Sequence, residues 1–140
     1  MNAVVIFESL TGNTGKAAEL IAGELRSSGV ETSVFPIDQI ALGTLAAAQL
    51  VIVGSWVDGM FFFGQRPGRA GRLRQLPVID GKQAAVFCTY AMDPGKTLTK
   101  LSEIVADRGG VVVGGVAIHR KQMAEGATDF VDRLLATAQA

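Results

Sequence analysis

The chain has 140 residues, of which 49% are hydrophobic and 19% are charged. This length supports one domain with a substantial core, so we predict a single domain over residues 1–140. The 13 basic residues balance the 13 acidic residues, and a chain without net charge has no global field to attract nucleic acid or an anionic membrane surface.

The first half of the chain alternates strand and helix patterns. An apolar, β-branched run predicts a first strand over Asn2–Phe7. Apolar residues at helical spacing predict a helix over Thr14–Ser28, and Gly29 is a typical helix stop. A shorter, edge-like strand is predicted at Val30–Pro36, and a weak helical piece at Leu42–Ala48.

The second half continues the alternation. Three continuous apolar runs, Leu50–Gly54, Gln83–Cys88 and Val111–Ile118, are typical of parallel strands that are buried on both faces. Helices are predicted over Lys96–Arg108 and Gln122–Ala138. We therefore predict an α/β fold in which right-handed crossovers join parallel strands and helices cover both faces of the sheet.

The segment between the first strand and the first helix reads SLTGNT and is rich in polar residues. The free N–H groups of a helix's first turn carry partial positive charge and bind anions. Gly12 allows close backbone approach, while Ser9, Thr11, Asn13 and Thr14 add side-chain donors. The alternative is that these residues only cap the helix, but one cap residue would suffice. The segment therefore favours phosphate binding, although it matches neither GxxxxGK[ST] nor GxGxxG.

This segment resembles the fingerprint of the flavodoxin family, which is a strand followed by [ST]-x-T-G-x-T and a helix. Ser9, Thr11, Gly12 and Thr14 stand at the matching positions. The resemblance implies a flavodoxin-like three-layer sandwich with a five-stranded parallel sheet of order 2-1-3-4-5. It also implies that this loop binds the phosphate of FMN and that the protein transfers single electrons between redox partner proteins. Flavodoxins are typically strongly acidic, whereas this chain is neutral.

In a sheet of that order, ligands bind at the carboxyl edge between the first and third strands. The loop after Leu50–Gly54 would then meet the ligand. It contains Trp56, the only tryptophan, which can stack on one face of the flavin ring. The alternative is a core tryptophan packed under the loop. Asp58–Gly59 is a turn signal, and its backbone groups can reach the redox-active edge of the flavin.

The loop after Gln83–Cys88 contains Tyr90, the only tyrosine, which is a candidate for the opposite face of the ring. The matching flavodoxin loop often reads GxGD, a motif that this chain lacks. Asp93 and Pro94 form a typical helix start, with Asp93 as the predicted N-cap. The predicted FMN-binding residues are Ser9, Thr11, Gly12, Asn13, Thr14, Ser55, Trp56, Val57, Asp58, Gly59, Thr89, Tyr90 and Met92.

Two further features lie between these loops. The three phenylalanines Phe61–Phe63 cannot all be buried in one regular element, so we expect at least one to pack over the site or onto a partner. Arg66, Arg69, Arg72 and Arg74 form a basic cluster. This cluster is either a solvated turn or a docking patch for an acidic partner or for a nicotinamide dinucleotide.

The remaining composition limits the chemistry. A single cysteine, Cys88, excludes an intramolecular disulfide, and a single histidine, His119, cannot build a metal site, so a cofactor must carry any redox chemistry. The apolar runs are too short to span a membrane, and no signal peptide is recognisable, so we expect a cytoplasmic protein.

Three functions remain open at this point. One is electron transfer between redox partners, with an NAD(P)H-dependent reductase as a candidate donor. The second is a flavin-dependent oxidoreductase that acts on a quinone or a protoporphyrinogen-type compound. The third is a flavodoxin-fold interaction module that binds no flavin.

Overall fold

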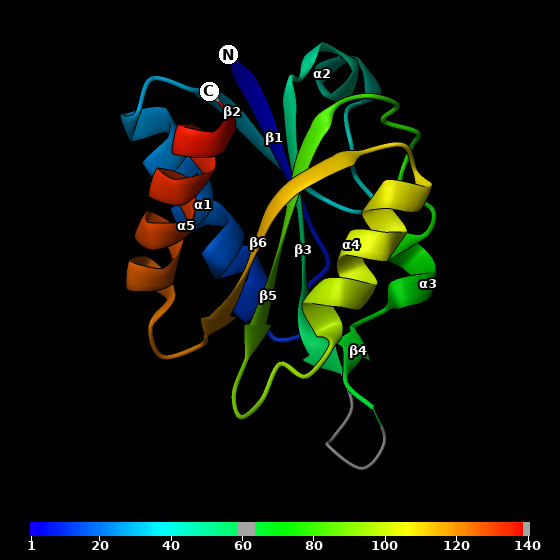
Figure 1. Ribbon diagram of the computed structural model, residues 1–140, viewed down its shortest axis with the longest axis vertical. Coiled ribbons are helices and arrows are strands. Elements are labelled where there is room, and N and C mark those ends of the chain that lie inside the picture. The colour runs from blue at the N-terminus through cyan, green and yellow to red at the C-terminus, as the bar shows by residue number, and fades with distance from the viewer. Residues whose placement is uncertain (59–63, 139–140) are drawn as a thin grey trace.

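The computed structural model describes residues 1–58 and 64–138, and the statements below concern these residues. Five parallel strands form a sheet of order β2-β1-β3-β5-β6 (Figure 1). Their bounds are β1 Asn2–Phe7, β2 Glu31–Pro36, β3 Leu50–Asp58, β5 Gln83–Tyr90 and β6 Val111–His119. The two-residue strand β4, Arg66–Pro67, pairs antiparallel with the end of β3. In chain order the parallel strands are arranged 2-1-3-4-5, so the predicted order is confirmed.

Helices cover both faces of the sheet, as predicted (Figure 1). The helices α1 (Asn13–Ser27) and α5 (Met123–Ala138) pack side by side on one face. The other face carries α2 (Leu42–Ala47), α3 (Ala70–Leu73) and α4 (Thr97–Asp107). In the described ranges, no helix is both long enough and apolar enough to cross a bilayer.

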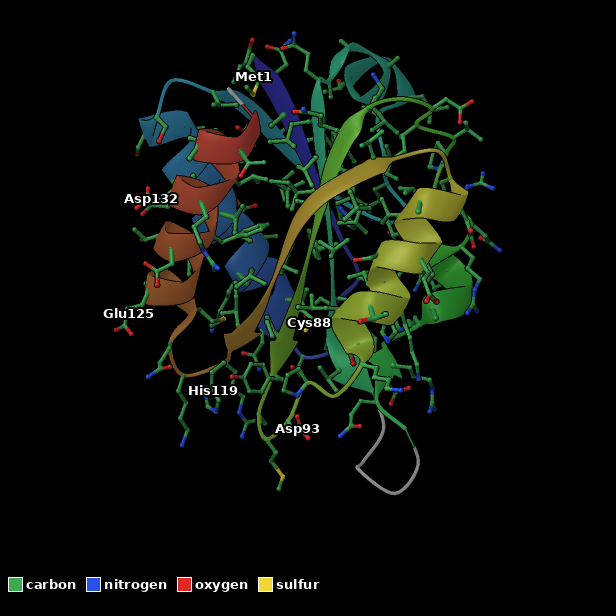
Figure 2. All side chains as sticks on the ribbon, viewed as in Figure 1. Met1, Cys88, Asp93, His119, Glu125 and Asp132 are labelled. Atoms are coloured by element: carbon green, nitrogen blue, oxygen red, sulfur yellow. The ribbon has the colours of Figure 1, made fainter. Side chains whose placement is uncertain are left out.

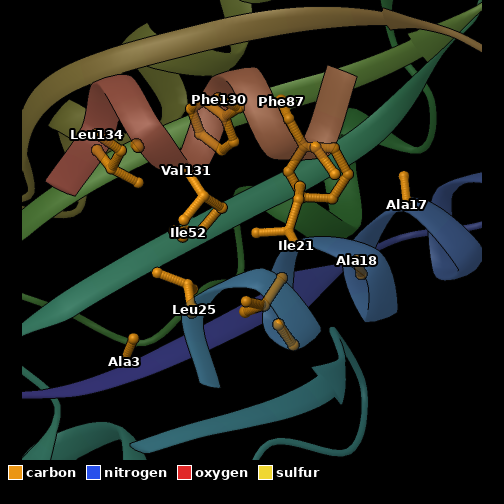
Figure 3. Close-up of a cluster of buried hydrophobic side chains, with 14 of the residues drawn as sticks. Ala3, Ala17, Ala18, Ile21, Leu25, Ile52, Phe87, Phe130, Val131 and Leu134 are labelled. Atoms are coloured by element: carbon orange, nitrogen blue, oxygen red, sulfur yellow. The ribbon is translucent and has the colours of Figure 1, made fainter. Parts of the chain in front are cut away.

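The core is divided by the sheet into two clusters, because successive side chains of a strand point to opposite faces. On β3, Ile52 faces α1 and α5, whereas Val51 and Val53 face the opposite cluster. The first cluster packs Ile52 and Phe87 against Ile21 of α1 and other apolar side chains of the two helices (Figure 3). This double burial explains why the central strands are continuous apolar runs.

Gly54 of β3 is required by the close approach of a neighbouring ring. It pairs in register with Phe87 of β5, whose side chain is fully buried. A Cβ atom built on Gly54 would lie 2.0 Å from the Phe87 ring, so only glycine fits without displacement. Phe87 therefore fills the space that a side chain at position 54 would occupy.

Several boundaries differ from the prediction. Strand β3 does not end at Gly54 but continues to Asp58, because β4 supplies antiparallel partners for its last residues. Strand β5 likewise continues to Tyr90 along β6. Asp93 does not cap α4, which begins at Thr97; its carboxylate instead accepts a hydrogen bond from Gly95 N in a local turn (3.1 Å). Neither β4 nor α3 was predicted.

Candidate functional site

The carboxyl ends of the parallel strands lie at one edge of the sheet, the lower edge in Figure 1. The segments that follow Phe7, Gly54 and Cys88 are predicted to meet there, and residues from all three segments line one cavity of about 140 Å³. Figure 2 shows His119 and Asp93 at the same end of the molecule. The lining residues are Leu10, Thr11, Asn13, Thr14, Trp56, Val57, Thr89, Tyr90, Ala91 and Arg120.

The first wall is the turn that leads from β1 into α1. Gly12 adopts the left-handed conformation (φ 94°) and is the N-cap residue of α1, so no hydroxyl side chain caps the helix. The Ser9 hydroxyl instead accepts a hydrogen bond from Gly12 N (3.1 Å), which stabilises the turn. The first turn of α1 contains no acidic residue. The amide groups of that turn therefore keep their partial positive charge, which favours anion binding over simple capping.

Two threonines join the turn before α1 to the end of β5. The hydroxyl of Thr14, in the first turn of α1, lies 2.9 Å from the hydroxyl of Thr89 near the end of β5. Both side chains are buried. A hydroxyl pair at this position is polar without being charged, so it lines the cavity without repelling an anion.

Trp56 forms the second wall, and it lies on β3 rather than in a loop. Gly68 N donates to the carbonyl of Trp56 (2.9 Å), and the buried Ser55 hydroxyl donates to the carbonyl of Gly68 (2.8 Å). A Cβ on Gly68 would lie 2.0 Å from the indole, so the ring packs directly against this backbone. The indole is half-buried and still lines the cavity. The packing and stacking interpretations are therefore compatible.

Tyr90 forms the third wall and packs against His119 at the end of β6. Their ring centroids are 5.2 Å apart, with an edge-on angle of 84°. Lys121 N donates to Nδ1 of His119 (3.1 Å), so the proton of the neutral imidazole is on Nε2, which donates to the carbonyl of Ala91 (2.8 Å). His119 thus supports Tyr90 and the turn that follows it, a role that its isolation in the sequence did not indicate.

Cys88 lies on β5, one residue before the cavity wall. Burial raises the pKa of its thiol to about 12. The thiol is therefore neutral at physiological pH and offers no nucleophile or metal ligand. Among the residues that the structure describes, no group of three or more His, Cys, Asp or Glu side chains could hold a metal ion.

The basic cluster is largely paired with carboxylates. Arg66 lies 3.4 Å from Asp58, and Arg69 lies 3.0 Å from the buried Glu8. Arg72 contacts Glu8 at 3.3 Å and the exposed Asp38 at 2.9 Å. The sequence shows the run of arginines, but the carboxylates come from distant segments that only the fold brings close. Arg74 is exposed.

The structure thus brings together seven of the predicted site residues, and others lie beside the cavity with different contacts. Ser9 and Gly12 shape the first turn, Ser55 holds Gly68, and Asp58 pairs with Arg66. Met92 is 76% exposed and does not line the cavity. Gly59 and the three phenylalanines Phe61–Phe63 lie outside the described residues. The seven residues are Thr11, Asn13, Thr14, Trp56, Val57, Thr89 and Tyr90.

Three lining residues were not predicted: Leu10, Ala91 and Arg120. Arg120 directly follows β6, and its backbone N–H donates to the carbonyl of Tyr90 (2.9 Å). Its place in the sequence gives one signal, because a residue that follows a parallel strand belongs to the ligand-binding edge. The sequence does not show, however, that the end of β6 reaches the turn before α1.

The chain is similar to known proteins along most of its length. Residues 4–114 match a family model described as a flavodoxin domain. A flavodoxin from Clostridium beijerinckii is 26% identical over 128 residues, which cover 91% of this chain and 93% of that protein. The solution structure of two-electron reduced Megasphaera elsdenii flavodoxin superposes with a TM-score of 0.75 at 19% identity and covers 99% of both chains, a likeness that concerns the fold. Oxidised flavodoxin 1 from Bacillus cereus gives a TM-score of 0.66 at 25% identity over 94% of this chain and 98% of that one.

Proposed function

This chain belongs to the flavodoxin family of flavin-binding electron-transfer proteins, and from that membership we propose that its flavin is FMN, bound in the cavity at the carboxyl edge of the sheet. The observation that supports the proposal is that walls of three different kinds line one cavity. An amide-rich turn lies on one side, and Trp56 and Tyr90 lie on others. A phosphate suits the first wall, and a flat ring suits the two aromatic side chains.

The residues present fit this cofactor at its charged end. The first turn of α1 has free amide groups and no carboxylate, and Thr11 and Asn13 add neutral donors. Arg120 is a cation on the same cavity. We therefore assign the phosphate to the turn Ser9–Thr14, with Arg120 adding charge attraction that the neutral donors lack.

The residues also fit at the ring end. Trp56 and Tyr90 come from β3 and β5, which are neighbours in the sheet, and Val57 and Thr89 line the same cavity. When bound, FMN supplies the one-electron chemistry, and the protein sets how readily its flavin accepts charge. An apolar, aromatic surround disfavours the negatively charged reduced flavin.

The experiment that tests this assignment is an absorption spectrum of the purified chain before and after it is mixed with FMN and separated from free FMN by gel filtration. Flavin absorbance that co-elutes with the protein supports the proposal. A colourless protein that FMN does not stabilise would instead support the flavin-free interaction module. Turnover with NAD(P)H and a quinone, without a second protein, would support the small-molecule oxidoreductase.

Trp56→Ala and Tyr90→Ala are each expected to weaken FMN binding about tenfold, since base–aromatic stacking contributes roughly 1–3 kcal/mol per stacked ring. Each change should also move the midpoint potential of the bound flavin, because it lets water reach the ring. Fluorescence titration and redox titration measure the two effects. Leu20→Ala, on the exposed side of α1, is the matched control. Unchanged potentials in both aromatic variants would contradict ring stacking.

A docking surface for an acidic redox partner, such as an NAD(P)H-dependent reductase, is the second part of the proposal. The basic cluster Arg66, Arg69, Arg72 and Arg74 lies on the β4–α3 segment next to Trp56, so it is close to the proposed ring site. Three of the four arginines are paired with carboxylates, which leaves the exposed Arg74 as the main candidate contact.

Reduction of the FMN-loaded protein by an acidic reductase is expected to slow as ionic strength rises. Salt screens exposed charges, and charges at the rim of an interface act mainly on the association rate. Arg74→Glu should lower the second-order rate at low salt and flatten its salt dependence. Stopped-flow reduction of the FMN-loaded protein measures both effects. Arg133→Glu, on α5 at the opposite face of the sheet, makes the same charge change and should have little effect. Equal slowing in the two variants would contradict this docking site.

A further inference from the structure

Arg69 has an unusual backbone conformation directly beside the site. It precedes α3 with φ 50° and ψ 48°, and it is the one non-glycine residue with positive φ in the described ranges. This left-handed conformation is disfavoured for residues that carry a Cβ. The surrounding structure must therefore hold Arg69 in place, which makes its contacts worth tracing.

The first contact is with Glu8, the residue after β1. Its side chain is 5% exposed, and its Oε1 accepts a hydrogen bond from Arg69 Nη1 at 3.0 Å. Arg72 Nε lies 3.3 Å from the other oxygen, Oε2, but without hydrogen-bond geometry. A buried carboxylate needs a well-placed cation, and Arg69 supplies the directed contact.

The second contact is with Trp56. The Arg69 guanidinium carbon lies 5.8 Å from the indole centroid, which is within cation–π range. The preceding residue, Gly68, packs against the same ring. Arg69 thus joins Glu8, which leads into the phosphate turn, to Trp56, which lines the ring end of the cavity.

We propose that Arg69 is a positioning residue for the flavin site: anchored by Glu8, it fixes the indole of Trp56 and places a positive charge beside it. This inference rests on the proposed binding of FMN. It assigns no contact between Arg69 and the cofactor, because Arg69 acts through Trp56.

The arrangement has a directional consequence for the redox potential. Reduction of the bound flavin adds negative charge, and a nearby guanidinium favours that charge. Loss of the guanidinium also leaves the buried Glu8 carboxylate less well compensated. Both effects make the negative charge of the reduced flavin less favourable, so removal of the Arg69 guanidinium should make the midpoint potential of the bound flavin more negative.

The test compares Arg69→Gln and Arg69→Lys with Arg74→Gln, an exposed arginine in the same segment that makes the same charge change. Trp56 is the only tryptophan, so fluorescence of the FMN-free protein reports on its packing directly. In Arg69→Gln we expect stronger acrylamide quenching and a more negative midpoint potential after FMN loading. We also expect an FMN dissociation constant that rises by up to about fivefold, as for loss of a cation–π contact.

Arg69→Lys keeps the positive charge, so its midpoint potential should stay close to that of the unsubstituted protein. Arg74→Gln should match the unsubstituted protein in acrylamide quenching, midpoint potential and FMN dissociation constant. If Arg69→Gln fails to fold, Arg69→Gly removes the guanidinium at a backbone position that suits glycine. Unchanged quenching and potential in Arg69→Gln, or equal shifts in Arg74→Gln, would overturn the inference. If the original protein binds no FMN, the proposed function fails first, a result that is separable because the quenching comparison needs no FMN.

Discussion

Thr11→Asp is expected to lower the affinity for FMN by between fivefold and a thousandfold while leaving the affinity for riboflavin nearly unchanged. Thr11 lines the cavity in the turn that we assign to the phosphate. Two like charges 4 Å apart repel by about 1 kcal/mol in water and by about 4 kcal/mol at an effective dielectric constant of 20. Thr11 is exposed, so the lower half of this range is the more relevant one. Quenching of Trp56 fluorescence by each ligand provides the measurement.

Thr11→Asn is the matched control, because asparagine has the shape of aspartate without its charge. It should bind FMN within a few-fold of the original protein. Riboflavin lacks the phosphate and therefore separates repulsion from misfolding of the turn. If the aspartate variant lost both ligands equally, the turn would be disturbed as a whole, and the phosphate assignment would lose its support.

Gly54→Ala is expected to be the most destabilising small substitution near the site. The added Cβ would lie 2.0 Å from the fully buried Phe87 ring, in the centre of the sheet. Overpacking of this kind costs about 1–3 kcal/mol. For a chain of this length each kcal/mol lowers the melting temperature by about 3–4 °C. Thermal unfolding followed by circular dichroism measures the loss.

Gly23→Ala makes the same chemical change in a different environment. Gly23 lies within α1, and a Cβ there would meet no atom within 4 Å. Because glycine is a poor helix former, this variant should gain about 0.5–1 kcal/mol of stability. If Gly54→Ala lowers the stability of the protein and Gly23→Ala raises it, the packing explanation is supported. If the two variants are equally stable, the Phe87 ring moves aside without cost.

The parts of the fold that depend on local patterns could be predicted from the sequence. The bounds of β1 and the start of α1 follow from an apolar run that ends at a glycine-containing polar turn. The strand order came from the resemblance carried by that turn, and the structure confirms it. Residues at the carboxyl ends of buried strands, such as Trp56 and Tyr90, could be placed at the cavity because parallel strands share one carboxyl edge.

The parts that depend on distant contacts could not be predicted. Strand β4 has two residues, and it exists because the end of β3 offers it a partner. Arg69 is one arginine among four in the sequence, and its role depends on Glu8, which is 61 residues away. Arg120 belongs to the cavity because the end of β6 lies next to Tyr90. Local periodicity contains no information about such pairings.

The strand β6 also bears on how copies of this chain behave at high concentration. Within the described residues it is the last strand of the sheet, and its pairing with β5 shifts register between Ala84 and Ala85, where one extra residue of β6 is accommodated. An irregularity of this kind bends the strand and interrupts its row of outward hydrogen-bonding groups. A second molecule that tried to extend the sheet there would find a poor template, which protects the protein against edge-to-edge polymerisation.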